Sequence, residues 1–286
     1  MNKEVLEIFQ GSAKKLFVDC TVGAGGHSYH ILSVFPDARV IAIDQDEDSI
    51  ALARENLKDF GRRVSFHLGS FCDLFEHFNC RQLAVSGILV DPGISTVQLK
   101  KSQRGFSHTV DGPLDMRKDR SMELTAADVL NSYPEEKLVE IFRRYGECVE
   151  AGRLAKKIIE KRLFVRFQST VQLRLLIEDV THWRPRPGLL HPAAKVFQAL
   201  RIFINHELDG VESWLEKIPL NLRAGGRVIF ITYHSLEDRL VKKGFQRLQL
   251  LKKVKLLRPF PSFPGAEELA QNQASRSAKI RALEVA

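Results

Sequence analysis

Residues 16–27 read Leu-Phe-Val-Asp-Cys-Thr-Val-Gly-Ala-Gly-Gly-His, and this stretch decides the fold. Its first five residues form an apolar run that predicts a short buried strand, and the glycines after it predict a tight turn into a helix. Because glycine has no Cβ atom, the backbone of such a turn can approach a ligand closely. The stretch therefore predicts a parallel α/β sheet with a ligand at the end of its first strand.

The residues around these glycines distinguish two classes of nucleotide-binding protein. The dinucleotide fingerprint G-x-G-x-x-G requires a third glycine at the position that Ser28 occupies. That fingerprint also has no use for an acid four residues before the first glycine, where this chain has Asp19. An NAD-dependent dehydrogenase is therefore disfavoured, and an acid at this position is typical of enzymes that bind S-adenosylmethionine.

Strand and helix patterns alternate along the first hundred residues and then give way to helices. Further strand-like runs lie at residues 39–43, 64–68 and 86–90, with a crossover helix expected at 47–60. Four helical patterns follow at residues 135–145, 149–161, 170–181 and 192–215. The last expected elements are a strand at 225–234, a helix at 236–248, a loop-like tail at 259–274 and a strand at 278–285. The sheet domain is therefore expected to be discontinuous, with a helical insertion.

Two side chains stand where a nucleoside cofactor would need them. Asp44 follows the second expected strand, where a carboxylate can accept hydrogen bonds from both hydroxyl groups of a ribose. Phe71 follows the third strand, and its ring is suited to stack on an adenine. Each residue also has a structural interpretation, because Asp44 can cap the next helix and Phe71 can belong to the core.

The fourth expected strand ends in Asp91-Pro92-Gly93-Ile94. This order resembles the Asp/Asn-Pro-Pro-aromatic motif of methyltransferases that act on exocyclic base amines. Such an amine is a poor nucleophile, and an oxygen that accepts its N–H group pushes electron density toward nitrogen and orients the lone pair. Because Gly93 and Ile94 replace the second proline and the aromatic residue, stacking on the base must come from another residue. A plain Asp-Pro-Gly turn is the structural alternative.

Six motifs make the chain similar to the bacterial 16S rRNA (cytosine-N4)-methyltransferase family over nearly its whole length. They lie at residues 18–28 (VDCTVGAGGHS), 104–107 (RGFS), 111–117 (DGPLDMR), 197–205 (FQALRIFIN), 234–239 (HSLEDR) and 275–281 (SRSAKIR). Three features depart from the family pattern. The His and Pro that usually come before Glu4–Leu6 are not found in this sequence, the family's Asp-Leu-Gly is Asp-Pro-Gly at residues 91–93, and one of its methionines is Lys118.

The resemblance implies a fold, a cofactor and its contacts. The fold class would be α/β, a class I (Rossmann-like) S-adenosylmethionine-dependent methyltransferase sheet with an inserted all-helical domain. The sheet would occupy residues 1–104 and 205–286, and residues 105–204 would form the helical domain that recognises the substrate. The family's contacts to S-adenosyl-L-methionine carry over to Gly25, Gly26, His27, Asp44, Phe71, Asp91 and Gln98. No metal is expected.

The catalytic candidates are Asp91, Asp111, Asp115 and His234. Asp111 and Asp115 lie just before the helical patterns, where their carboxylates can face both cofactor and base. An ordered loop tied by a pair between Asp115 and a nearby arginine is the alternative. His234 follows a strand and can orient the base or accept a proton, whereas Ser235 is expected to cap the following helix.

Composition limits the class of protein and favours one kind of partner. Of the 286 residues, 44% are hydrophobic and 27% are charged, and the longest apolar runs have the length of a strand, which argues against transmembrane and disordered chains. The first ten residues lack the pattern of a secretory signal, so we expect a cytoplasmic protein with no membrane partner. The four cysteines form no C-x-x-C pair and are expected to be reduced. The net charge of +8 favours RNA, with cationic stretches at 239–258 and beside Trp183 as candidate phosphate contacts.

These observations together predict transfer of a methyl group from S-adenosyl-L-methionine to the exocyclic N4 of a cytidine in 16S rRNA, by direct in-line displacement. The expected partner is 16S rRNA or the small ribosomal subunit particle, and a homodimer is left open. A non-catalytic rRNA-binding or ribosome-assembly protein and a methyltransferase acting on another base amine are the alternatives. A C5-cytosine methyltransferase needs a cysteine nucleophile, usually set after a proline, and no cysteine of this chain follows a proline.

Overall fold

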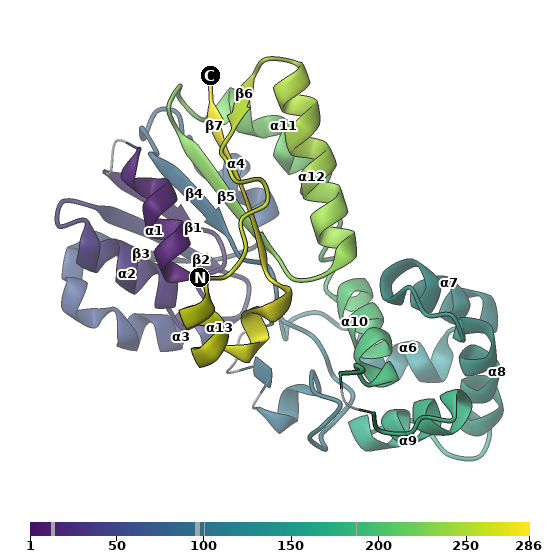
Figure 1. The fold of residues 1–286 in the computed structure, drawn as a ribbon. Coiled ribbons are helices and arrows are strands. Elements are labelled where there is room, and N and C mark those ends of the chain that lie inside the picture. Colours follow the sequence, from purple (N-terminus) through teal and green to yellow (C-terminus); the bar gives the residue numbers. More distant parts are fainter. Residues whose placement is uncertain (13–14, 95–97, 100, 187) are drawn as a thin grey trace. The chain divides into compact units, whose positions relative to one another are not determined.

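The computed structural model describes residues 1–12, 15–94, 98–99, 101–186 and 188–286. The chain forms two compact units, which are described separately below. Unit 1 comprises Met1–Gly93 and Leu208–Ala286, and unit 2 comprises Ile94–Glu207. Unit 2 is thus inserted into the sequence of unit 1 (Figure 1), with divisions after residues 93 and 207, where the sequence patterns suggested 104 and 204.

Unit 1 contains a seven-stranded sheet in the order β3-β2-β1-β4-β5-β7-β6. Its strands are β1 Leu16–Asp19, β2 Arg39–Asp44, β3 Val64–Leu68, β4 Gly87–Val90, β5 Arg227–Thr232, β6 Val254–Leu256 and β7 Lys279–Val285. Strands β1 to β5 run parallel to one another, whereas β7 pairs antiparallel with both β5 and β6. The expected parallel sheet is present, with an antiparallel edge that the strand patterns alone did not indicate.

Helices cover both faces of this sheet (Figure 1). The α-helices of unit 1 are α1 Asn2–Gln10, α2 Gly26–Val34, α3 Glu47–Asn56, α4 Leu74–His77, α11 Val211–Asn221, α12 Ser235–Leu250 and α13 Ala266–Gln271. Its 3₁₀ turns are η1 Lys58–Arg63, η2 Phe71–Asp73 and η4 Gln273–Ser277. Successive residues of β5 alternate between two cores, because Phe230 packs with the α11 and α12 residues and Ile229 with those of α1 and α2. Burial on both faces explains why the central strands β4 and β5 read as nearly continuous apolar runs.

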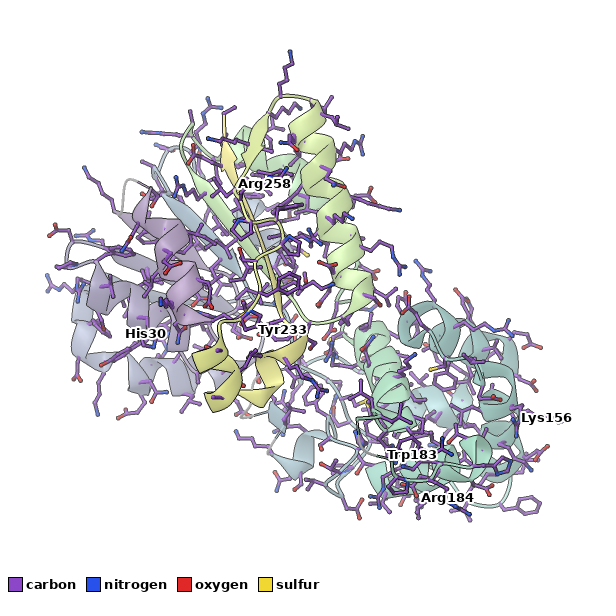
Figure 2. The ribbon with its side chains drawn as sticks, in the orientation of Figure 1. His30, Lys156, Trp183, Arg184, Tyr233 and Arg258 are labelled. Carbon is purple, nitrogen blue, oxygen red and sulfur yellow. The ribbon has the colours of Figure 1, made fainter. Side chains whose placement is uncertain are left out.

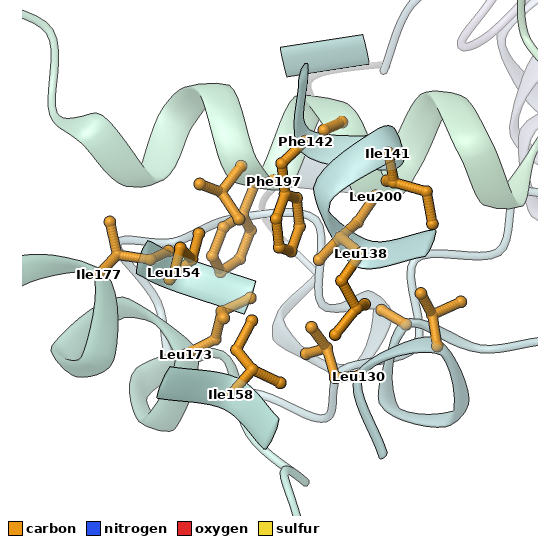
Figure 3. Close-up of a cluster of buried hydrophobic side chains, with 14 of the residues drawn as sticks. Leu130, Leu138, Ile141, Phe142, Leu154, Ile158, Leu173, Ile177, Phe197 and Leu200 are labelled. Carbon is orange, nitrogen blue, oxygen red and sulfur yellow. The ribbon is translucent and has the colours of Figure 1, made fainter. Parts of the chain in front are cut away.

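Unit 2 is a bundle of short helices around its own core. Its elements are η3 Ser102–Arg104, α6 Ala126–Ser132, α7 Glu135–Gly146, α8 Ala151–Arg162, α9 Thr170–Thr181 and α10 Pro192–Ile204. Figure 3 shows Phe142 of α7 and Phe197 of α10 in this core, where both side chains are buried. Capping boxes at Thr125 and Ser169 begin α6 and α9, since each hydroxyl accepts the backbone N–H three residues later. The helical insertion expected from the sequence is present.

The single helix expected at residues 192–215 was wrong. The chain leaves the helix at Asn205, whose side-chain amide donates to Met116 O at 2.7 Å and whose Oδ1 accepts from Lys118 N at 2.6 Å. A second helix, α11, begins after Gly210, which has a φ of 76° in the left-handed region. Backbone bonds close the end of α10, because His206 has a φ of 51° in the left-handed region and Glu207 N donates to Ile202 O at 3.2 Å. The Asn205 side chain ties this end to a distant segment.

The expectation of a loop-like tail at residues 259–274 was also wrong, because α13 lies within it. Helix α1 and strand β6 were not expected. No helix among the described residues is long and apolar enough to cross a membrane.

Candidate active site

Most of the predicted site residues of unit 1 lie at one edge of the sheet. The carboxyl ends of parallel strands share an edge, and in open α/β sheets this edge binds ligands. The predicted residues follow successive strands there, with Gly25, Gly26 and His27 after β1, Asp44 at the end of β2, Phe71 after β3, Asp91 after β4 and His234 after β5. Along this edge the residues lie in the order of the strands, β3-β2-β1-β4-β5, which differs from their order in the sequence.

The glycines after β1 have separate reasons to be glycine. Gly25 precedes α2 with a φ of 88°, and a Cβ atom there would lie 3.1 Å from the Leu57 side chain. Gly26 begins α2, and a Cβ atom there would meet no described atom within 4 Å. The backbone at Gly26 therefore borders open space, as a turn that receives a ligand requires.

Asp19 ties this turn to the sheet. Its side chain is buried and accepts hydrogen bonds from Ser28 Oγ at 2.7 Å and from Thr21 N at 3.3 Å. Burial raises the pKa of the Asp19 carboxyl above its usual value. Ser28, which replaces the third glycine of the dinucleotide fingerprint, thus anchors α2 to the end of β1.

Asp44 holds the same turn from β2. Its Oδ2 accepts from Gly23 N at 2.9 Å, and its Oδ1 accepts from Asp46 N at 3.0 Å. The cap of α3 is Asp46, which accepts from Asp48 N at 3.3 Å and from Ser49 Oγ at 3.2 Å. A carboxylate has about four acceptor positions, so these two amide bonds are compatible with hydrogen bonds from ribose hydroxyls. The ribose contact stays a prediction.

Phe71 and Gln98 belong to different units. Phe71 lies in η2 and contacts Trp214 edge-on, with 5.7 Å between ring centroids, and Phe230 at 6.1 Å. Its ring is only partly buried, so the core contact and the predicted adenine contact are compatible. Gln98 lies in unit 2 with 6% of its surface exposed.

Asp91 is held from three sides. Its backbone N–H donates to Thr21 Oγ1 at 2.7 Å. Its Oδ2 lies 3.4 Å from both His27 Nε2 and the Tyr233 hydroxyl. The other oxygen, Oδ1, is buried and has no hydrogen-bond partner among the described residues. His27 Nδ1 is likewise buried and has no hydrogen-bond partner among the residues that the structure describes.

The environment of His27 favours its protonated form. Burial alone would lower the pKa of His27, but the hydrogen bond to Asp91 and the charges of Asp91 and Asp19 raise it overall. Two polar atoms, His27 Nδ1 and Asp91 Oδ1, therefore lie buried beside the glycine turn without a described partner. A buried polar atom without a partner is costly, so this geometry favours a polar ligand at this point.

His234 has a structural role that was assigned to Ser235. The His234 side chain caps α12, because Nδ1 accepts from Glu237 N at 3.3 Å, and the expected Ser235 cap was wrong. Nε2 of His234 lies 3.3 Å from Glu237 Oε1. Both ring nitrogens thus face Glu237, and the catalytic role of His234 stays a prediction.

Asp111 and Asp115 lie in unit 2, in the loop before α6. Asp115 forms a bidentate pair with Arg117, at 2.8 Å to Nε and 2.9 Å to the terminal nitrogen, as the ordered-loop alternative expected. Burial acts to raise the pKa of Asp115, but the bonds from Arg117 lower it below its usual value. Asp111 is exposed, and its Oδ1 accepts from Val171 N at the start of α9, at 3.4 Å. The catalytic roles of both carboxylates stay predictions.

Unit 2 also contains a buried ion cluster that sequence reasoning missed. In this Glu207 cluster, one carboxylate oxygen lies 2.7 Å from Lys118 Nζ, and the other accepts from Arg201 Nε at 3.0 Å. Burial would raise the pKa of Glu207, but Arg201 and Lys118 lower it to about 2. Lys118, the departure from the family's methionine, therefore has a defined partner. The sequence signal for this cluster was a lysine at a position where the family has a methionine.

The residues of unit 1 fit S-adenosyl-L-methionine. Open space at Gly26 suits close approach of the ligand to backbone, and Asp44 supplies a carboxylate at the end of β2. His27 Nδ1 offers a buried hydrogen-bonding atom beside the glycine turn, suited to a polar amino-acid moiety. Together they provide what a nucleoside linked to an amino acid requires.

Comparisons with known proteins identify the family to which the chain is similar. The MraW methylase family matches residues 1–286. A protein of Gloeothece citriformis named ribosomal RNA small subunit methyltransferase H is 44% identical over 266 residues, covering 93% of this chain and 86% of the relative. A protein of Nostoc punctiforme with the same name is 41% identical over 284 residues, covering 99% and 92%.

A solved structure of an rRNA methylase from Streptococcus thermophilus aligns over 100% of this chain and 96% of that chain, with 12% identity and a TM-score of 0.44. This likeness is too remote to add to the assignment, which depends on the full-length match and on the two relatives. The chain belongs to the MraW methylase family.

Proposed function

We propose that this protein transfers a methyl group from S-adenosyl-L-methionine to the exocyclic N4 of a cytidine in the 16S rRNA of the small ribosomal subunit. The observation that carries the proposal is Asp91, which follows β4 beside the glycine turn and presents a buried Oδ1 with no hydrogen-bond partner among the described residues. Membership of the MraW methylase family and the names of the relatives support rRNA as the substrate.

The proposal gives the site residues separate roles. The residues that would hold the cofactor are Gly25, Gly26, His27, Asp44, Phe71, Asp91 and Gln98. When bound, the cofactor supplies an electrophilic methyl group on a sulfonium. Asp91 Oδ1 would accept an N–H of the amine and aim the nitrogen lone pair for in-line displacement. Asp111, Asp115 and His234 remain proposed contributors to orienting the base or accepting the amine proton.

The partner that we propose is 16S rRNA or the small-subunit particle, which places the protein in the cytoplasm. Unit 2 is proposed as the part that recognises this substrate, because it interrupts the sheet domain in sequence and carries Asp111, Asp115 and Gln98. A homodimer is compatible with this proposal but is not needed for it.

The test is transfer of a labelled methyl group by the purified full-length chain. We expect label in small-subunit particles or in 16S rRNA, none in large-subunit particles, and a strong loss with the Asp91→Ala variant. Cofactor binding by calorimetry without transfer to either substrate would instead support a non-catalytic rRNA-binding protein. Absence of cofactor binding would refute the assignment of the glycine turn.

A further inference from the structure

Tyr233 contacts the Asp91-Pro92-Gly93 turn through both its hydroxyl group and its ring. It follows β5 directly and lies in unit 1 (Figure 2). The hydroxyl lies 3.4 Å from Asp91 Oδ2. A Cβ atom on Gly93 would lie 3.7 Å from two ring carbons of Tyr233, so the ring packs beside this glycine. Residues 142 positions apart in the sequence thus meet at the adjacent ends of β4 and β5.

We propose that Tyr233 orients the Asp91 carboxylate and supplies the aromatic face beside the target base. The proposal rests on the proposed function, since it concerns the same methyl-transfer site. It makes Tyr233 the substitute for the aromatic residue that the Asp-Pro-Gly-Ile sequence lacks.

The hydrogen bonds of Asp91 show how Tyr233 acts. Tyr233 and His27 both approach Oδ2, whereas Oδ1 is buried and has no partner among the described residues. Because both donors meet the same oxygen, they fix the orientation of the carboxylate and leave its other oxygen without a described partner. Oδ1 is thereby kept for an N–H group of a ligand.

Tyr233 is suited to be a permanent donor. Burial, together with the negative charge of Asp91, raises the pKa of Tyr233 far above its usual value, so the phenol stays protonated. Its main chain is fixed as well, since Tyr233 N donates to Glu237 Oε2 at 3.1 Å. The hydroxyl therefore holds Asp91 from a position anchored on α12.

The ring of Tyr233 also provides a surface for stacking. The side chain is only partly buried, and Gly93 has no side chain to cover the ring. Stacking between a base and an aromatic side chain contributes roughly 1 to 3 kcal/mol per base. The hydroxyl and the ring thus make two separable contributions, one to orienting Asp91 and one to binding the base.

Two variants separate these contributions. Tyr233→Phe keeps the ring and removes the hydroxyl, so we expect single-turnover methyl transfer at saturating cofactor to fall about tenfold to a hundredfold, with KM for the RNA substrate within about twofold. Tyr233→Leu removes the ring as well, and we expect KM for the RNA substrate to rise at least about fivefold. Tyr29→Phe, an exposed tyrosine on α2 of unit 1, is the matched control and should leave both parameters unchanged.

A purely structural tyrosine would give another pattern. Tyr233→Phe would then transfer methyl groups at the parental rate, and this result would overturn the role of the hydroxyl. An unchanged KM in a folded Tyr233→Leu variant would overturn the stacking role. Thermal melting of each variant shows whether Tyr233→Leu remains folded, and if it does not, Tyr233→Trp replaces it with the expectation of a near-parental KM.

A readout independent of activity separates this inference from the proposed function. Asp91 and Asp19 are the carboxylates that raise the pKa of His27. With the Tyr233 hydroxyl removed, the charge of Asp91 Oδ2 acts on His27 alone, so we expect the His27 pKa to rise in an NMR titration of Tyr233→Phe. An unchanged His27 pKa refutes the positioning role even if the parent methylates no RNA.

Discussion

Replacing Asp44 by alanine separates a contact to the cofactor from the integrity of the loop that binds it. Asp44 accepts from Gly23 N at 2.9 Å and from Asp46 N at 3.0 Å, and it is also the predicted acceptor for the ribose hydroxyls. The substitution therefore removes two internal hydrogen bonds and the ribose acceptor together. Cofactor affinity and protein stability should both fall.

The expected magnitudes follow from these contacts. Loss of two amide bonds to a half-buried carboxylate should lower the free energy of unfolding by about 2 kcal/mol, because the amides regain hydrogen bonds with water. Ribose hydroxyls left without an acceptor should cost about 1 to 3 kcal/mol of binding, which raises Kd about 5-fold to 150-fold.

Asp46→Ala is the matched control. It removes the cap of α3, since Asp46 accepts from Asp48 N and Ser49 Oγ, but it retains the backbone N–H that Asp44 accepts. We expect a loss of about 1 kcal/mol in the free energy of unfolding and an unchanged Kd. Isothermal titration calorimetry with S-adenosyl-L-methionine gives Kd, and urea denaturation gives stability.

Two results would refute this reasoning. If Asp44→Ala binds the cofactor with the parental Kd, Asp44 accepts no ribose hydroxyl. If both variants weaken binding equally, the order of the loop rather than a direct contact sets the affinity. A cofactor analogue without ribose hydroxyls should bind the parent and Asp44→Ala with similar Kd values, since the contact at issue is then absent from both complexes.

Three further predictions concern catalysis, pH and RNA binding. Asp91→Ala should slow single-turnover methyl transfer about 10²-fold to 10³-fold. Asp91→Asn should retain more activity, because it keeps one acceptor oxygen. A parental rate for the alanine variant would make Asp91 a turn residue only. The pKa of Glu207 is about 2, below its unfolded value of 4.5. The Glu207 cluster should therefore stabilise the protein by about 3 kcal/mol above pH 4.5, and this contribution should be lost as the pH falls toward 2. Urea denaturation at pH 5 and pH 3 checks this, and an equal loss in Glu207→Gln would contradict it. Lys242 and Lys243 are exposed on α12. Reversing their charges should flatten the slope of log affinity for rRNA against log salt concentration by roughly 1.5, without changing cofactor affinity. An unchanged slope would make them ordinary solvated lysines.

Much of the fold follows from local patterns in the sequence. The central strands β4 and β5 were predictable because both faces of the sheet are covered there, which makes each of them an apolar run. Helix α9 has the predicted bounds of residues 170–181, because Ser169 and Gln172 form a capping box at its start. The grouping of polar residues at the strand ends could also be predicted, since parallel strands place their carboxyl ends at one edge.

Features that depend on distant partners could not be predicted. The chain breaks after α10 where His206 takes a left-handed conformation, and no local pattern indicated that turn or the bonds from Asn205 to Met116 and Lys118. Ser235 was expected to cap α12 from residue preferences, but the His234 ring takes the position instead. Tyr233 ends an apolar run, so it resembles a core residue until β4 and β5 place it against Asp91.

The central claim is the identity of the methylated atom, and mass spectrometry of nucleosides tests it most directly. Small-subunit particles are incubated with the full-length chain and S-adenosyl-L-methionine labelled in the methyl group, and the 16S rRNA is then digested to nucleosides. The account predicts that the label appears in N4-methylcytidine and that the Asp91→Ala variant reduces it strongly. Label in 5-methylcytidine or in a methylated purine, or no label in a chain that binds the cofactor, would contradict it.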